Sequence, residues 1–162
     1  VPPLMKKISR MNSFNAPFIL ELPKHLVMMN EIIQTRPDVH RGWLEAELDA
    51  QLFLADTDNA NEVAKMADDQ TEGMDRKILW ASLYRDENRV NKLTLDFVFN
   101  DKVRNMLNAS AAFLAGKKKF GKRTTLRPQA VYDEVARQVL ADRGLKSPLG
   151  KIDGVPLSEY RP

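Results

Sequence analysis

The feature that most constrains the fold is a pair of helix signals joined by a short polar turn, within residues 44–73. Leucines recur at helical spacing in the first run. The second run carries Ala60, Ala64 and Ala67 at i, i+4 and i+7, which is one face of an α-helix. The turn at 56–59 holds residue types that cap helix starts. Small side chains on that face let two helices approach closely, so this stretch predicts a helix hairpin.

Helix signals continue along the chain and predict about seven helices. The predicted starts lie near residues 23, 37, 58, 75, 88, 100 and 127. Proline opens the first two, since it suits a first helical turn, and Gly116 and Gly144 are natural stops for the last two. The helix from Asn88 is expected to carry Leu93, Phe97 and Val98 on one face. No stretch reads as a strand, so the predicted fold class is all-α.

Both ends of the chain read as extended tails around a helical-hairpin domain of residues 23–144. Residues 1–22 contain three prolines, and residues 145–162 contain three prolines and two glycines. Such tails form no core of their own and are suited to lie across a neighbouring protein as clasps. The candidate partner-binding residues of the two tails are Phe14, Phe18, Leu157 and Tyr160.

The connections between the predicted helices are short, which makes consecutive helices antiparallel neighbours and predicts a stack of hairpins. The starts near residues 23, 58 and 89 recur at close to the period of about 34 residues of helical-repeat proteins. A compact irregular bundle would give most of the same signals and remains open. We expect most of the large aromatic residues in the core, and any left outside would mark a protein interface. They are Trp43, Trp80, Tyr84, Phe97 and Phe99.

Charge is distributed unevenly, although the formal net charge is only +3. Residues 45–75 hold ten acidic side chains against one base, whereas residues 117–127 hold six bases and no acid. This separation of acidic and basic residues is typical of a protein that is oriented by charged partners. The alternative is that the acidic face is simply solvated and the basic segment is a linker without a binding role. The candidate partner-binding residues of the basic segment are Lys117, Lys118, Lys119 and Phe120.

No motif in the sequence indicates a catalytic reaction. The chain has no cysteine, so disulfides and cysteine-based zinc sites are excluded. It contains neither of the glycine-rich phosphate-binding motifs, GxxxxGK[ST] and GxGxxG. His25 and His40 have no histidine or carboxylate at i+3 or i+4 with which to bind a metal ion. No apolar run approaches the roughly 18–20 residues that span a bilayer. We therefore expect no catalytic residues, no cofactor, no metal and no membrane insertion.

Residues 44–73 resemble a pentatricopeptide repeat unit. Asp49 and Ala50 lie in the middle of the first helix, an acidic turn follows, and Ala60 begins the second helix, with Met66 near its end. The glycine usual in the turn of that family is absent, and Met66 lies about one position early. In mass and layout, residues 23–144 also resemble the family of extra eighteen-kilodalton subunits of euglenozoan (trypanosome and relatives) mitochondrial F1-ATPases.

The second resemblance implies a structural accessory subunit without a nucleotide site, bound to the alpha subunit outside the F1 head of ATP synthase. It implies a mitochondrial location on the matrix side of the inner membrane. The basic start at Val1 fits either a trimmed chain or one left by removal of a targeting peptide. The pentatricopeptide resemblance leaves an alternative open, an RNA-binding or mitoribosome-associated repeat protein.

Overall fold

The computed structural model describes residues 28–71, 73, 75–84, 94–117 and 122–162. These residues are mostly helical, as the sequence predicts. The α-helices are α2 (Asn30–Thr35), α3 (Pro37–Ala55), α4 (Ala60–Gln70), α5 (Arg76–Leu83), α6 (Asp101–Gly116) and α7 (Glu134–Asp142). The other regular elements are strands β1 (Thr94–Leu95) and β2 (Gly150–Lys151) and the 3₁₀ turns η1 (Thr57–Asn59), η2 (Pro128–Ala130) and η3 (Leu157–Glu159).

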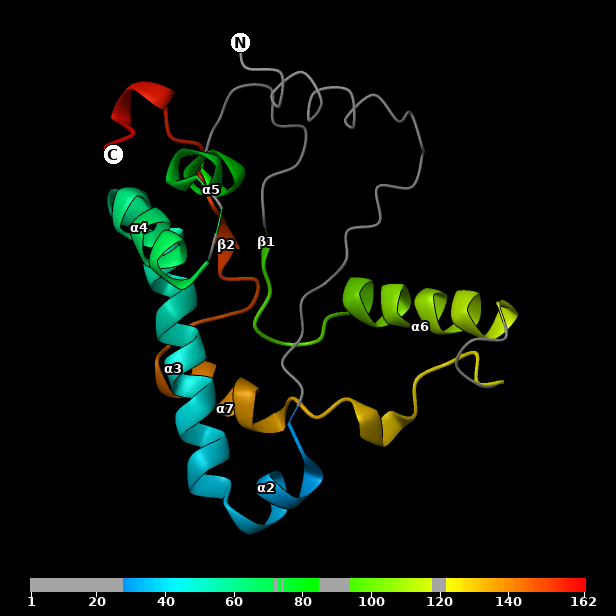
Figure 1. Cartoon of the computed structure of the whole chain (residues 1–162). Helices are drawn as coiled ribbons and strands as arrows, with labels where there is room; N and C mark the ends of the chain where they lie inside the picture. The colour runs from blue at the N-terminus through cyan, green and yellow to red at the C-terminus, as the bar shows by residue number, and fades with distance from the viewer. Residues whose placement is uncertain (1–27, 72, 74, 85–93, 118–121) are drawn as a thin grey trace.

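The long helix α3 forms the axis of the body (Figure 1). α4 and α5 pack together at one end, while α2 and α7 contact α3 toward the other. α6 extends sideways from this body. The consecutive pairs α2–α3 and α4–α5 are in contact, but α3 also packs against α7 from far along the chain. α3 and α4, which hold the hairpin predicted over residues 44–73, are not among the helix pairs that pack along one another; each contacts the turn η1 between them. The described residues therefore show a helical fold and do not confirm a stack of hairpins.

Side-chain caps begin two of the helices where the sequence predicts them. At the start of α5, the Asp75 carboxylate accepts hydrogen bonds from the backbone N–H groups of Lys77 and Ile78. At the start of α6, Asn100 Oδ1 accepts from the N–H of Val103 at 2.9 Å. These bonds satisfy N–H groups that have no partner inside the helix, which fixes where each helix starts.

The end of α7 follows the predicted glycine stop. Gly144 has a φ of +67°, a left-handed conformation that glycine adopts without a steric penalty. The N–H of Leu145 donates to the carbonyl of Leu140 at 2.9 Å, and that of Gly144 donates to Ala141 at 3.0 Å. This is the Schellman arrangement, so the predicted end is confirmed. The start is later than predicted, because residues 128–130 form the separate turn η2.

The predicted helix from Asn88 is wrong over the part that the structure describes. Residues 94–95 form strand β1, and residues 96–100 are irregular up to the cap of α6. Positions 85–93 lie outside the described residues. β1 pairs antiparallel with β2, placing Leu95 opposite Gly150. The expectation that the chain has no strand is corrected by this short ladder.

The C-terminal segment 145–162 is not a free extended tail. Ile152 is fully buried and Val155 is nearly so. The N–H of Val155 donates to the carbonyl of Tyr84 at 2.7 Å, which fastens the segment to the end of α5. The segment is therefore part of the folded body. The predicted tail of residues 1–22 lies outside the described residues.

Two hydrophobic clusters hold the body together. The first gathers buried residues from α4, α5, β1 and the C-terminal segment: Ala60, Ala64, Trp80, Tyr84, Leu95, Ile152 and Val155. The second lies between α3 and α7 and contains Leu48, Val139 and Leu140. Leu149 packs against both clusters and joins them. None of the described helices has the length and apolar character needed to cross a membrane.

Candidate interaction surface

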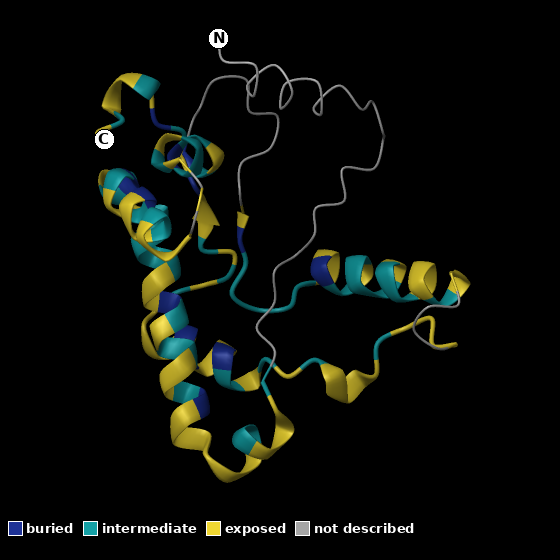
Figure 2. Ribbon diagram, in the orientation of Figure 1, coloured by how far each residue is buried: buried dark blue, intermediate teal, exposed yellow. Residues whose placement is uncertain are grey.

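α6 and the chain that returns from it form a projecting arm, which we call the α6 arm and define as residues 101–117 and 122–130. Figure 2 shows that the fully buried part of α6 is confined to its first turn, where Val103 lies, while half-buried residues alternate with exposed ones along the rest of the helix. The returning segment runs beside the helix. It is tied there by the N–H of Leu126, which donates to Asn108 Oδ1 at 2.9 Å.

The base of the α6 arm is held by one carboxylate. Asp133 Oδ2 accepts hydrogen bonds from the backbone N–H of Phe99 at 3.2 Å, from Arg104 at 3.4 Å and from Arg137 at 2.8 Å. Its side chain is only 12% exposed, whereas the two arginines are more open to solvent. Such a shielded, charge-assisted cluster fixes the direction in which α6 leaves the body.

The outer part of the α6 arm exposes large apolar side chains. Phe113 is 63% exposed and Leu114 is 37% exposed. Lys117 Nζ lies 5.4 Å from the centre of the Phe113 ring, a cation–π contact at the end of the helix. An amphipathic helix normally turns its apolar side toward the core, so these side chains form a surface without a partner in the described structure.

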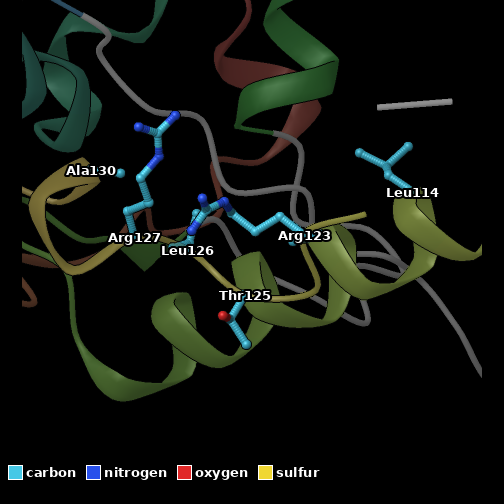
Figure 3. A pocket seen from close by; sticks show the side chains of 7 residues that line it. Leu114, Arg123, Thr125, Leu126, Arg127 and Ala130 are labelled. Atoms are coloured by element: carbon cyan, nitrogen blue, oxygen red, sulfur yellow. The ribbon is translucent and has the colours of Figure 1, made fainter. Parts of the chain in front are cut away.

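A shallow hollow of about 260 Å³ opens between α6 and the returning segment (Figure 3). Its lining combines aliphatic side chains with two arginines: Ala111, Leu114, Arg123, Thr125, Leu126, Arg127 and Ala130. In the described residues, neither arginine has an ion-pair partner or a side-chain hydrogen bond, and the same is true of Lys122. The hollow therefore has aliphatic side chains next to two arginines whose positive charges are not neutralised by an acidic side chain of the described residues.

A second exposed apolar surface runs along α3. Val39, Trp43, Ala46 and Ala50 are all exposed and follow one another at intervals of four, three and four residues. This spacing places them on one stripe of the helix, the pattern of a helix–helix seam. Trp43 is 56% exposed, although most of the large aromatic residues were expected in the core. The three- and four-residue intervals in the sequence indicate that these residues share one side of the helix, and the structure shows that this side is exposed.

The acidic stretch of residues 45–75 is partly neutralised within the chain. Arg143 forms an ion pair with Asp49, and Arg76 pairs with Asp68 at 3.1 Å. The hydrogen bond from Arg143 lowers the pKa of the Asp49 carboxyl below its ordinary value. The acidic face is therefore less repulsive toward anions than the sequence implies.

The structure separates the residues that the sequence nominates for partner binding. Lys117 lies at the end of α6, on the arm. Leu157 and Tyr160 do not lie on the arm; they pack against the first hydrophobic cluster. The Tyr160 ring meets the Trp80 ring edge-on at 5.7 Å. The other nominated residues lie outside the described part of the chain: Phe14, Phe18, Lys118, Lys119 and Phe120.

The described residues contain no cluster of three or more histidine, aspartate or glutamate side chains placed to hold a metal ion. His40, which is buried, packs against the Tyr132 ring with 5.7 Å between ring centres. No model of a protein family, no curated protein and no solved structure matches this chain.

Proposed function

We propose that this protein is a non-catalytic subunit that binds other proteins within a larger assembly. The observation that carries the proposal is the α6 arm, a helix of 16 residues with one buried residue and with Phe113 and Leu114 turned to solvent. Helices in proteins gain most of their stability from packing of an amphipathic face rather than from helix propensity. A partner that covers the apolar side of α6 supplies that packing.

The assembly we propose is mitochondrial ATP synthase, with the chain on the outside of the F1 head against the alpha subunit. This part of the proposal rests on the resemblance to the euglenozoan accessory subunits. In that interpretation, residues 44–73, which run from within α3 to just past the end of α4, correspond to a pentatricopeptide-like unit. The exposed stripe that contains Trp43 would be a second contact with the assembly.

Binding of single-stranded RNA, for instance within a mitoribosome, is the second candidate, and one observation favours it. Lys122, Arg123 and Arg127 have no acidic partner in the described structure and lie on a projecting segment. Phosphates neutralise such cations readily, and binding would then weaken steeply with salt.

The test is affinity purification of the tagged protein from its native cells, with and without nuclease, followed by mass spectrometry. Near-stoichiometric, nuclease-resistant recovery of F1 alpha and beta subunits is the expected result. Stoichiometric recovery of a different protein complex would overturn the F1 assignment and keep the subunit proposal. Recovery of RNA and ribosomal proteins that disappears after nuclease treatment would overturn both.

A further inference from the structure

We propose that the hollow of the α6 arm binds an acidic amphipathic helix of the partner protein. Apolar side chains of that helix would enter the floor, and its aspartate or glutamate side chains would meet Arg123 and Arg127. This inference rests on the proposed function, because it names the chemistry of the partner that a protein-binding subunit would take.

The size of the hollow fits protein side chains. Its volume of about 260 Å³ is below the roughly 300–1,000 Å³ of pockets that enclose small-molecule ligands. The aliphatic residues that line it are Ala111, Leu114, Leu126 and Ala130. One or two leucine or phenylalanine side chains from a neighbouring helix can occupy such a depression, as anchors do at protein interfaces.

The positive charge of the α6 arm favours a partner helix with acidic side chains. As defined, the α6 arm contains six bases and one acid, so even with Arg104 paired to Asp133 it has little means of neutralising itself. The side chains of Arg123 and Arg127 extend from the returning segment at the hollow (Figure 3). A guanidinium group binds a carboxylate through two parallel hydrogen bonds, which makes arginine well suited to an acidic partner.

The lining favours a protein over RNA at this site. Proteins that bind single-stranded nucleic acid stack bases on aromatic rings beside a basic groove. The residues that line the hollow include no aromatic side chain, and its floor is aliphatic. An aliphatic floor beside two arginines is complementary to a helix that has leucine on one face and glutamate beside that face.

The experiment measures binding of synthetic fluorescent peptides to the full chain by anisotropy. The probe is a peptide of about 16 residues, the length of α6, with leucine at i, i+3, i+4 and i+7 and glutamate at most other positions. A matched peptide carries glutamine in place of glutamate. We expect the glutamate peptide to bind about tenfold more tightly than the glutamine peptide, with the difference shrinking as salt is raised.

The variant Arg123→Glu/Arg127→Glu should weaken binding of the glutamate peptide by about tenfold or more. Leu114→Asp should weaken both peptides. The matched control, Lys146→Glu/Lys151→Glu, makes the same change in net charge at two exposed positions away from the α6 arm and should bind like the unmodified protein. Circular dichroism verifies that the variants keep their helical content.

Equal binding of the glutamate peptide to the arginine double variant and to the control would overturn the inference. So would tighter binding of an oligouridylate of about 15 nucleotides that is lost in the same double variant. The two proposals fail separately. If the native assembly co-purifies equally well with the arginine double variant, the hollow is not the contact and the subunit function stands. If no protein assembly co-purifies with the unmodified chain, the function itself fails.

Discussion

At the scale of single residues, Asp133 is the side chain on which the direction of the α6 arm depends. Replacement of Asp133 by Asn keeps the shape but removes the negative charge that faces two arginines and a backbone N–H. We expect the free energy of unfolding to fall by about 1–3 kcal/mol, measured by urea denaturation. Asp142→Asn is the control, because Asp142 belongs to an exposed ion pair worth about 0–1 kcal/mol. An equal loss in both variants would contradict the assigned role.

The raised pKa of the buried Tyr84 hydroxyl makes the free energy of unfolding depend on pH in the alkaline range. Burial, aided by the nearby Asp56 carboxylate, raises the pKa of Tyr84 to about 12 from its ordinary value of 10.0. The neutral hydroxyl donates to the Leu54 carbonyl at 2.9 Å. As the pH rises from 10 to 12, the unfolded chain loses this proton while the folded chain keeps it. The free energy of unfolding contributed by Tyr84 is therefore constant below pH 10 and falls by about 2 kcal/mol up to pH 12.

The variant Tyr84→Phe isolates this effect. It loses the hydrogen bond, at about 1 kcal/mol near pH 7, but it should lack the part of the alkaline decline that comes from the phenol. Denaturation of both proteins at pH 8, 10 and 11.5 measures the difference. Parallel declines in the two proteins would show that Tyr84 does not control the alkaline transition.

At the scale of elements, the C-terminal segment contributes to folding. Ile152 is fully buried in the first hydrophobic cluster, so Ile152→Ala should lower the free energy of unfolding by about 2–5 kcal/mol. Lys151→Ala, at the neighbouring exposed position, should change it by less than about 0.5 kcal/mol. Thermal or urea denaturation measures both. If Ile152→Ala is as stable as Lys151→Ala, the segment is a dispensable tail after all.

Signals within a few residues predict the starts of α3, α4, α5 and α6, whereas contacts between distant residues leave no local pattern in the sequence. The helix starts near residues 75 and 100 and the stop at Gly144 depend on local residues, and the structure confirms them. The strand at 94–95 forms because it meets 150–151, a pairing that helical periodicity cannot reveal. The proline-rich C-terminus reads as a tail because its two buried side chains, Ile152 and Val155, lack a recognisable period.

Only part of the candidate site can be predicted from the sequence, because the rest depends on contacts between residues that are distant in the chain. The cluster of bases after α6 was visible as a charge run, and Lys117 was nominated from it. The hollow depends on α6 and the returning segment lying side by side, which brings Leu114 to Arg123 and Arg127. The exposure of Trp43 depends on which side of α3 the rest of the body covers. Neither property is written in local spacing alone.

At the scale of the whole molecule, charge separates the body from the α6 arm. Carboxylates of the body, such as Asp49 and Asp68, form ion pairs with arginines of the same chain. The outer bases of the arm form no ion pair with an acidic side chain of the described residues. Positive potential on a projecting arm steers an acidic partner toward it. Once the partner is purified, raising the ionic strength should lower the association rate constant more than it raises the dissociation rate constant, measured by stopped-flow fluorescence. An association rate that is independent of salt would contradict electrostatic steering.

The central claim is that the α6 arm is the surface that joins this protein to its assembly. The most direct measurement compares how much of the assembly is recovered with tagged Phe113→Asp and with tagged Met66→Asp. Both residues are more than half exposed on a helix, and only Phe113 lies on the arm. We predict that Phe113→Asp reduces recovery about tenfold while Met66→Asp retains nearly all of it. Equal recovery with the two variants would show that the assembly is held by another face.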